Sequence, residues 1–337
     1  MKTAIFGFAG SGKSELFAAL AGPAAAAAGN RGMVKVPEPR LDPLIELFDP
    51  KKVTYSEIEY LDIPGGGGKG SGLGERVLNE IRPYECLLAV VDAFSGMNDP
   101  KAQYEAIEAD LLLGDLAVAE RRMERFGLDK RKARDLVDPK EEAAVARALA
   151  HLEDEKPLRD DPELAGLKEL KSYGFLTARP ILYAWNCPEG EADGFPLPDN
   201  GPARHHIALS ARLERELAEI EDPEEREMFC ADLGVTESAL DRVVAETYDL
   251  LGLISFLTAG EKEVRAWPVR RGATAPEAAG VIHTDFQKGF IRAEVLGWDD
   301  FLKAGSMKQA RDMGLARLEG KDYVVKDGDI VEFRFNV

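Results

Sequence analysis

The feature that most constrains this chain is a glycine-rich segment close to its N-terminus, Gly7-Phe8-Ala9-Gly10-Ser11-Gly12-Lys13-Ser14. It fits the pattern G-x-x-x-x-G-K-[ST], in which glycines let successive backbone N–H groups curl around phosphate oxygens. The apolar run Ala4–Phe8 leads into the segment, and residues of helical composition, Ser14–Leu20, follow it. This order of strand, loop and helix predicts a phosphate-binding loop at the positive end of a helix.

The motif also assigns roles to its side chains. Lys13 would bridge the β- and γ-phosphates of a nucleotide, and the Ser14 hydroxyl would bind Mg²⁺. A second segment, Leu61-Asp62-Ile63-Pro64-Gly65, ends an alternating run about fifty residues further on. Asp62 is predicted to hold Mg²⁺ through water, and the Gly65 N–H to sense the γ-phosphate. Such a turn is common by itself, but its distance from the phosphate loop favours the functional interpretation.

Five apolar runs are candidate strands: Ala4–Phe8, Glu57–Ile63, Cys86–Asp92, Pro180–Trp185 and Ile207–Leu209. Buried strands that are separated by helices and long crossovers indicate a mostly parallel sheet covered on both faces. The predicted fold class is therefore α/β, a P-loop NTPase. With 337 residues the chain can form two or three domains, and 45% hydrophobic residues exclude a disordered or fibrous protein.

The long stretch between the third and fourth strands predicts inserted helices. Asp-Pro pairs, typical of a helix N-cap followed by the first helical residue, occur at Asp99, Asp138 and Asp161, and again at Asp222. After the first pair, an apolar stripe recurs at helical spacing and is formed by Tyr104, Ile107, Leu111, Leu112, Leu116 and Met123. We expect an antiparallel helix pair that packs on itself, with a partner-binding groove as the alternative.

Downstream, Thr236–Leu251 is a further predicted helix, which Gly252 ends. From Leu253 onward, short alternating strands and glycine turns indicate a separate α+β domain, and its last segment, Tyr323–Val337, contains a turn signal between two strands. The predicted domains are residues 1–98 with 175–252 for nucleotide binding, 99–174 for the helical insertion, and 253–337 for the C-terminal domain.

Asn186-Cys187-Pro188-Glu189 follows the fourth strand, where regulatory GTPases carry the base-recognition motif N-K-x-D. An aspartate there accepts two hydrogen bonds from guanine, whereas adenine offers only one amino group nearby. Since Glu189 replaces that aspartate and Cys187 replaces the lysine, a guanine preference should be weak or lost. Ser210-Ala211-Arg212 follows the fifth strand and could close the base pocket with a backbone N–H.

These motifs, in the order GFAGSGKS, DIPG, NCPE and SAR, resemble the YchF-type, Obg-like ATPases. The resemblance covers the whole chain and is closest at Val36–Asp42 and Leu250–Val337. It implies a P-loop domain with a helical insertion and a C-terminal, β-grasp-like TGS domain. It further implies a preference for ATP over GTP through N-x-x-E, slow Mg²⁺-dependent hydrolysis, and association with ribosomes or RNA. By position, the phosphates then fall on Gly10, Ser11, Gly12, Lys13, Ser14 and Glu15, the metal on Ser14, and the adenine on Asn186, Cys187 and Glu189.

Two departures from the family pattern concern catalysis. The first switch of the family carries a threonine that completes the Mg²⁺ shell, but Gly22–Pro50 contains neither threonine nor serine. The segment after Gly65 is shorter, and Gly66 stands where other GTPases have a glutamine that positions water. The catalytic residue is unknown from the sequence. We expect hydrolysis slower than in relatives, gated by ordering of the loops Gly22–Arg31 and Gly65–Gly74 around γ-phosphate and Mg²⁺.

The net charge and the cysteine content limit which partners and which compartment the sequence predicts. The net charge of −18 repels nucleic acid and anionic membranes, so a nucleic-acid contact requires a local patch, and no DNA sequence specificity is expected. The window Lys262–Arg292 holds six basic and three acidic residues, which fits either an RNA-contacting face or an ordinary mixed-charge surface. Three distant cysteines, the short apolar runs and an N-terminus unlike a signal peptide predict a cytoplasmic protein without a membrane span.

Two other functions remain open at this point. A nucleotide-gated scaffold on the ribosome that does not hydrolyse nucleotide would fit the missing threonine and glutamine. A P-loop kinase for a small acceptor is the other alternative, but it gives no reason for Asn186-x-x-Glu189 or for the C-terminal block. The adjacent histidines His205 and His206 point in opposite directions on a strand, so at most one of them could face a ligand, and we expect structural roles for them.

Overall fold

The computed structural model describes residues 1–65, 72–132, 137–220, 222, 225, 228–230 and 238–336. Its contacts divide the chain into two compact units. The first comprises Met1–Val34 and Glu59–Leu250, and the second comprises Lys35–Ile58 and Leu251–Val337. The second unit therefore contains Lys35–Ile58, a segment that our sequence-based boundaries place in the nucleotide-binding domain.

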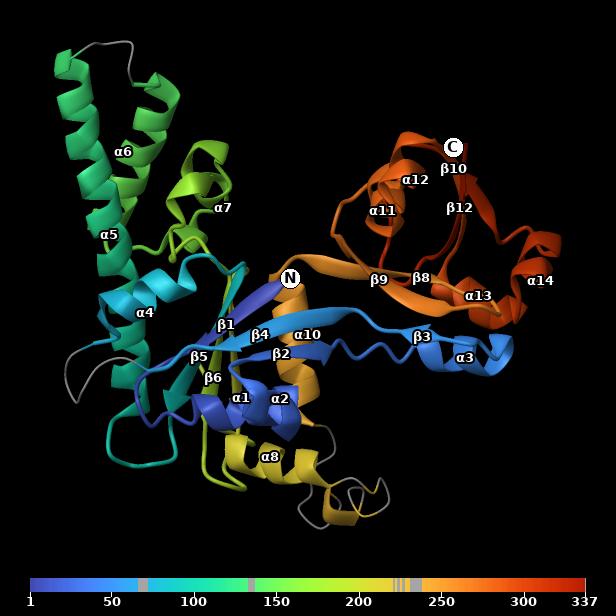
Figure 1. The fold of residues 1–337 in the computed structure, drawn as a ribbon, viewed down its shortest axis with the longest axis horizontal. Coiled ribbons are helices and arrows are strands. Elements are labelled where there is room, and N and C mark those ends of the chain that lie inside the picture. The colour runs from blue at the N-terminus through green and yellow to red at the C-terminus, as the bar shows by residue number, and fades with distance from the viewer. Residues whose placement is uncertain are drawn as a thin grey trace. The chain divides into compact units, whose positions relative to one another are not determined.

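A six-stranded sheet forms the centre of the first unit (Figure 1). Its strands are β1 (Lys2–Phe6), β2 (Arg31–Lys35), β4 (Glu57–Asp62), β5 (Cys86–Asp92), β6 (Ile181–Asn186) and β7 (Arg204–Leu209). They lie in the order β2-β4-β1-β5-β6-β7, and β1 is parallel to β4 and β5, β5 to β6, and β6 to β7. The predicted α/β fold with a mostly parallel sheet is confirmed. The sequence did not predict β2, whose residues are mostly exposed or half-buried.

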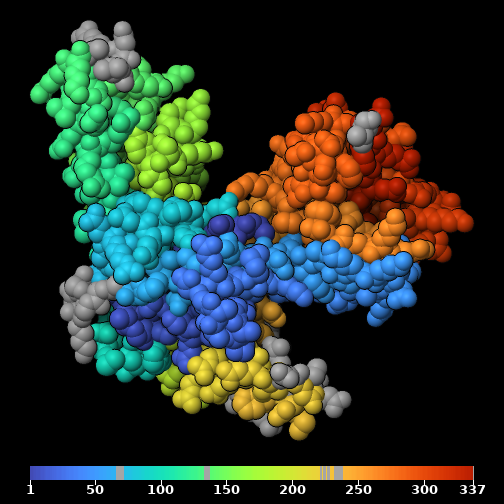
Figure 2. All heavy atoms as spheres, viewed as in Figure 1, coloured from blue at the N-terminus to red at the C-terminus, as the bar shows by residue number. Residues whose placement is uncertain are grey.

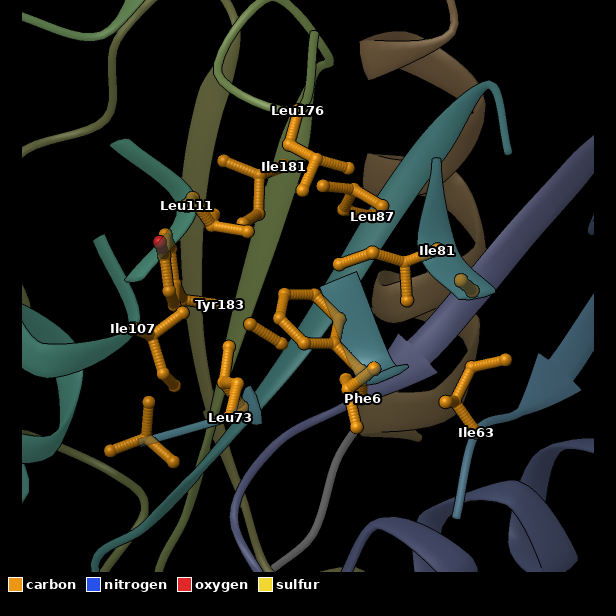
Figure 3. Close-up of a cluster of buried hydrophobic side chains, with 14 of the residues drawn as sticks. Phe6, Ile63, Leu73, Ile81, Leu87, Ile107, Leu111, Leu176, Ile181 and Tyr183 are labelled. Carbon is orange, nitrogen blue, oxygen red and sulfur yellow. The ribbon is translucent and has the colours of Figure 1, made fainter. Parts of the chain in front are cut away.

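Helices cover both faces of this sheet. On one face, the buried cluster of Figure 3 joins Phe6, Leu87, Ile181 and Tyr183 of the strands to Ile81 of α4 (Gly74–Ile81) and to Ile107 and Leu111 of α5 (Pro100–Lys132). Successive strand residues point to opposite faces, so His205 points away from the face of His206. His205 contacts Glu246 of α10 (Ala239–Leu250), which therefore lies on the opposite face. The remaining helices of this part are α1 (Lys13–Ala21), α2 (Pro23–Ala28) and α8 (Ala211–Glu219).

The helical insertion begins with α5, and α6 (Pro139–Glu153) runs beside it beyond the end of the sheet (Figure 1). It continues through the short helices η2 (Leu158–Asp160), α7 (Pro162–Ala165) and η3 (Lys168–Tyr173). The predicted Asp-Pro starts are confirmed at Asp99, Asp138 and Asp161, whose carboxylates accept from the N–H groups of Lys101, Lys140 and Leu164. Most of the segment in which a helix was predicted from Asp222-Pro223, and the first residues of the helix predicted at Thr236, lie outside the described residues.

The apolar stripe of α5 is shared between two cores. Its first members, Tyr104, Ile107 and Leu111, pack on the sheet, whereas Leu112, Leu116 and Met123 pack on the cluster formed with α6. The expectation of a helix pair that packs on itself therefore holds only for the second half of the stripe. Because one continuous helix serves both cores, the insertion is joined to the sheet through α5.

The second unit contains a second six-stranded sheet, in the order β11-β10-β12-β8-β9-β3. Its strands are β3 (Val53–Thr54), β8 (Leu253–Thr258), β9 (Val264–Arg270), β10 (Phe290–Leu296), β11 (Arg317–Glu319) and β12 (Ile330–Phe335). Its helices are α3 (Leu41–Phe48), α11 (Ala275–Ile282), α12 (Thr284–Lys288), α13 (Trp298–Ala304) and α14 (Met307–Asp312). This mixture confirms the expected α+β character of the C-terminal part.

One prediction for the C-terminal end is wrong. Of the two strands expected in Tyr323–Val337, only β12 forms, and Val324 makes an isolated bridge with Thr274. The turn before β12 is held instead by Asp329, whose carboxylate accepts from the Lys326 N–H at 2.8 Å and from the Tyr323 hydroxyl at 2.7 Å. Local side-chain bonds of this kind compete with strand pairing.

The segment Lys35–Ile58 belongs to the second unit for identifiable reasons. β3 pairs in parallel with β9, and Leu41 and Leu44 of α3 are fully buried in the core of this unit. Arg40 donates to Asp327 at 2.7 Å and to Glu38. Because these partners come from distant parts of the sequence, no local pattern could have indicated them.

His206 is enclosed by aromatic rings in the first unit. The Trp185 indole N–H donates to His206 Nδ1 at 3.2 Å, and the Tyr183 ring stacks on the imidazole. Burial lowers the pKa of His206 to about 4; Arg204 and, to a smaller extent, His205 act in the same direction, and Glu108 opposes them in part. The neutral imidazole of His206 thus has a structural role in the buried core, as the sequence predicted.

This burial predicts a pH dependence of stability. The unfolded chain takes up a proton at His206 near pH 6.5, whereas the folded chain does not until about pH 4, so stability falls as the pH drops through this window. Between pH 6.5 and 4.5 the wild type should lose about 2 kcal/mol more unfolding free energy than His206→Gln. Urea unfolding at both pH values measures this, and equal losses would contradict it.

Candidate nucleotide-binding site

The loop between β1 and α1 has the shape that the sequence predicts. Gly10 and Gly12 have φ angles of 84° and 87°, in the left-handed region that favours glycine. A Cβ atom on Gly12 would lie 2.2 Å from Asn186 Nδ2, so the loop also needs glycine for space. α1 begins without a side-chain N-cap hydrogen bond. The first N–H groups of α1 are therefore available to an anion at the positive end of the helix.

Lys13 brings a buried positive charge to this loop. The residue is 7% exposed, and its ammonium lies 3.4 Å from the Phe8 carbonyl oxygen. Burial lowers the pKa of Lys13, and the nearby Asp62 carboxylate partly offsets this effect. A Cβ atom on Gly65 would lie 2.6 Å from Lys13 Nζ, so the Gly65 backbone passes beside the ammonium. The phosphate loop Gly7–Ser14 and the segment Leu61–Gly65, both singled out in the sequence, therefore meet at the Lys13 ammonium.

Ser14 and Asp62 form the second part of the site. The Ser14 hydroxyl donates to Asp62 Oδ2 at 2.7 Å, which joins the start of α1 to the end of β4. Asp62 Oδ1 is buried and, within the described part of the chain, has no hydrogen-bond partner. A buried carboxylate oxygen without a donor is costly unless a cation or water satisfies it. Carboxylate and hydroxyl oxygens are hard ligands, so this pair fits Mg²⁺.

Asn186 connects the phosphate loop to the base-side loop. Its Nδ2 donates to the Ser11 carbonyl at 3.0 Å, and its Oδ1 accepts from the Ala211 N–H at 2.9 Å. Ser210 caps α8 by accepting from the Leu213 N–H. The structure therefore brings Asn186, Ser210 and Ala211 to the phosphate loop, at the carboxyl ends of the strands, where open α/β sheets bind ligands.

Of the other residues expected at the base, Cys187 is buried, whereas Glu189 and Arg212 are exposed. The Cys187 thiol is buried in the sheet core and donates to the Trp185 carbonyl at 3.4 Å, and burial raises its pKa to about 11. Its side chain therefore faces the core, and only its backbone borders the loop. Glu189 and Arg212 are exposed, and the Arg212 guanidinium donates to Glu216 at 3.0 Å.

Sequence reasoning missed the loop after β5. The Asp92 carboxylate accepts from the N–H groups of Phe94 and Ser95 and from the Ser95 hydroxyl. Phe94 is 42% exposed, and its ring would lie 3.9 Å from a Cβ on Gly12. A signal was available, since Asp92 ends a strand neighbouring β1 and β6 and so lies at the same sheet edge as Asp62 and Asn186.

Comparison with known proteins identifies the family. Residues 253–336 match the family model YchF-GTPase_C, described as a protein of unknown function (DUF933). The chain is 40% identical over 363 residues to the ribosome-binding ATPase YchF of Bacillus subtilis (strain 168), a match that covers 99% of this chain and 98% of that protein. The chain belongs to the YchF family. The resemblance that the motifs indicated is thereby confirmed.

Other YchF proteins show similar agreement. The ribosome-binding ATPase YchF of Haemophilus ducreyi is 41% identical over 366 residues, and the match covers 100% of this chain and 99% of that protein. The solved structure of the Schizosaccharomyces pombe YchF GTPase superposes with a TM-score of 0.85 at 30% identity and covers 99% of this chain and 97% of that one. The alignment with the Bacillus subtilis YchF is longer than the 337 residues of this chain, so that relative carries segments that this chain lacks.

Two properties of the described residues bear on metal binding and on membrane insertion. Among these residues, no three His, Cys, Asp or Glu side chains gather in a way that could hold a metal ion. Across the same residues, none of the helices combines the length and the apolar character that a membrane span needs. The oxygen pair of Ser14 and Asp62 thus differs from an all-protein metal cage, and it matches the way Mg²⁺ is held by few protein ligands together with substrate phosphates.

Proposed function

We propose that this chain binds Mg-ATP at the loop Gly7–Ser14 and hydrolyses it slowly, as a nucleotide switch that associates with ribosomes. The observation that carries the proposal is the geometry of Lys13, Ser14 and Asp62, with a buried ammonium, a free helix N-terminus and an unpartnered carboxylate oxygen at one point. The names of the relatives, ribosome-binding ATPase and YchF GTPase, support the same function.

Each residue has a role in this proposal. The backbone N–H groups from Gly10 to Glu15 and the Lys13 ammonium bind the phosphates, and Gly65 approaches the γ-phosphate through its N–H. Ser14 binds Mg²⁺, and Asp62 accepts from the Ser14 hydroxyl or from water on the ion. When bound, Mg²⁺ would neutralise charge on the β- and γ-phosphates.

The base-side residues favour adenine in this proposal. Asn186 fixes the loop, while the exposed Glu189 and the Ala211 N–H lie on the elements that border the base. A glutamate is one methylene longer than the aspartate that pairs with guanine, so it does not reproduce that pair at the same place. We expect ATP to bind more tightly than GTP, and a tenfold preference for GTP would overturn this part of the proposal.

Partner binding is assigned to the parts outside the nucleotide site. The proposed division has residues 1–34, 59–98 and 175–252 as the nucleotide domain, 99–174 as the helical insertion, and 253–337 together with Lys35–Ile58 as a TGS domain. The insertion or the TGS domain would contact ribosomal RNA or protein, and the mixed basic window Lys262–Arg292 offers positive charge for phosphates. A ribosome-associated protein of this kind would act in the cytoplasm.

The test of the metal role is a titration of a fluorescent ATP analogue with and without Mg²⁺. In the wild type, Mg²⁺ should raise the affinity about tenfold or more, because Ser14 and Asp62 would hold the ion and the ion would neutralise phosphate charge. In Asp62→Asn that gain should shrink to less than about threefold, since the amide no longer attracts the ion or its water. Asp154→Asn, an exposed carboxylate of the insertion, is the matched control and should behave as wild type. An undiminished Mg²⁺ effect in Asp62→Asn would contradict the assignment.

Turnover decides between the proposed ATPase and a scaffold that only binds nucleotide. The scaffold is favoured by one observation, the lack of serine and threonine in Gly22–Pro50, which removes a hydroxyl ligand of the first switch. Phosphate release should be measured in a single turnover beside nucleotide affinity. Slow release that disappears in Lys13→Ala supports the ATPase, and tight binding with no release supports the scaffold.

A further inference from the structure

An acidic side chain lies in the first turn of the helix that anchors the proposed phosphate site. Glu15 follows Ser14 directly, and its own N–H is among the groups expected to face the phosphates. A carboxylate in the first turn stabilises the empty helix through the dipole, but it repels a second anion bound at the same end. The chain as a whole carries a net charge of −18, so this repulsion needs local compensation.

Arg215 supplies a positive charge next to this carboxylate. Its Nη1 lies 3.4 Å from Glu15 Oε1, and its Nε donates to Glu219 at 3.2 Å. The arginine comes from α8, which packs against α1, and Figure 2 shows the yellow surface of α8 against the blue N-terminal residues. The Arg215 guanidinium therefore links α1, through Glu15, to its own helix α8, where it pairs with Glu219.

The neighbouring charges do not duplicate this contact. Arg212, the other arginine of this face, donates to Glu216 at 3.0 Å and interacts with Glu189 at longer range. Glu15 also attracts the Arg212 guanidinium, but less than Glu216 and Glu189 do. Four glutamates, at positions 15, 189, 216 and 219, thus share two arginines, and Arg215 is the one in ion-pair contact with Glu15.

We infer that Arg215 is a positioning residue for the nucleotide, which neutralises Glu15 and holds its carboxylate away from the phosphates. The inference rests on the proposed nucleotide site. With Glu15 neutralised, α1 presents its first backbone N–H groups to an anion although a carboxylate lies in its first turn. Because both side chains are partly exposed, the effect belongs to the moderate range of surface electrostatics and is sensitive to salt.

A double-mutant cycle on nucleotide affinity tests the inference in the full-length protein. At low salt, Arg215→Ala should weaken the binding of a fluorescent ATP analogue about fivefold, Glu15→Gln should strengthen it about threefold, and Arg215→Lys should stay within about twofold of wild type. In the Glu15→Gln background, Arg215→Ala should change the affinity by less than about twofold. Arg121→Ala, which removes one exposed charge from α5, is the matched control for net charge and should leave the affinity unchanged.

The cycle separates charge compensation from a structural role of Arg215. A structural role predicts that Arg215→Ala weakens binding equally in both backgrounds and at high salt, and either result would overturn the inference. At 0.5 M salt the loss should fall to less than about twofold. If wild type and Lys13→Ala bind the analogue equally poorly, the proposed function itself fails. If binding depends on Lys13 but Arg215→Ala binds as wild type, only the present inference fails.

Discussion

Lys13→Ala is expected to weaken the binding of Mg-ATP about 100-fold, the largest functional effect among our predictions. The ammonium is buried beside the Phe8 carbonyl, the Gly65 backbone and the Asp62 carboxylate, so it meets the phosphates in a region with little water. Losing a buried cation that faces a triphosphate leaves phosphate charge without a partner. Isothermal titration calorimetry with a non-hydrolysable ATP analogue measures the change.

The free protein should respond to the same substitution in a different way. Burial lowers the pKa of Lys13, which means that the empty site holds the charged ammonium at a cost. Removing it should therefore leave the thermal midpoint unchanged or slightly higher. Lys101→Ala, an exposed lysine of α5, is the matched control and should alter neither quantity. An affinity loss below about fivefold in Lys13→Ala, with the fold intact, would remove the main support for the proposed site.

The phosphate site was predictable because its chemistry is local. A glycine pattern specifies the backbone of one loop, and the residues after β1 and β4 reach the same sheet edge because parallel strands end there. The meeting of Lys13, Ser14 and Asp62 follows from these two rules. The role of Asn186 was predictable only in part. Its position at the end of β6 was clear from the sequence, but its two hydrogen bonds, to Ser11 and Ala211, depend on tertiary packing.

Features that depend on distant partners were not predictable from local patterns. Lys35–Ile58 joins the C-terminal unit through β9 and Asp327, which lie more than two hundred residues away in the sequence. The stripe of α5 showed which residues are apolar but not that two different cores would share them. The pair of Glu15 and Arg215 has the same origin, because only the packing of α1 on α8 brings these residues together.

The junction between the insertion and the sheet is held by a buried charge network centred on Glu108 of α5. Both Glu108 oxygens accept from Arg159 Nη1 at 2.9 Å, and the Tyr183 hydroxyl donates to Glu108 at 2.7 Å. Burial raises the pKa of Glu108, but Arg159 and Tyr183 outweigh this effect and lower it overall. The carboxylate is thus ionised and tied to η2 and β6, and β6 leads directly to Asn186 of the site.

Glu108→Ala is expected to destabilise the protein by about 3–5 kcal/mol, because it leaves the fully buried Arg159 without its counter-charge. Glu105→Ala, one turn earlier on α5, is the matched control; its carboxylate is exposed and lies 3.9 Å from Lys101, so it should cost less than about 0.5 kcal/mol. Urea unfolding measures both.

A combined replacement tests the cause of that destabilisation. In Glu108→Leu/Arg159→Met both charges are gone, and apolar side chains fill the junction. Stability should then return to within about 1 kcal/mol of wild type or exceed it, as for other buried ion pairs. A loss as large as that of Glu108→Ala would show that the hydrogen bonds to Tyr183 and Arg179, rather than the unpaired charge, hold the insertion on the sheet.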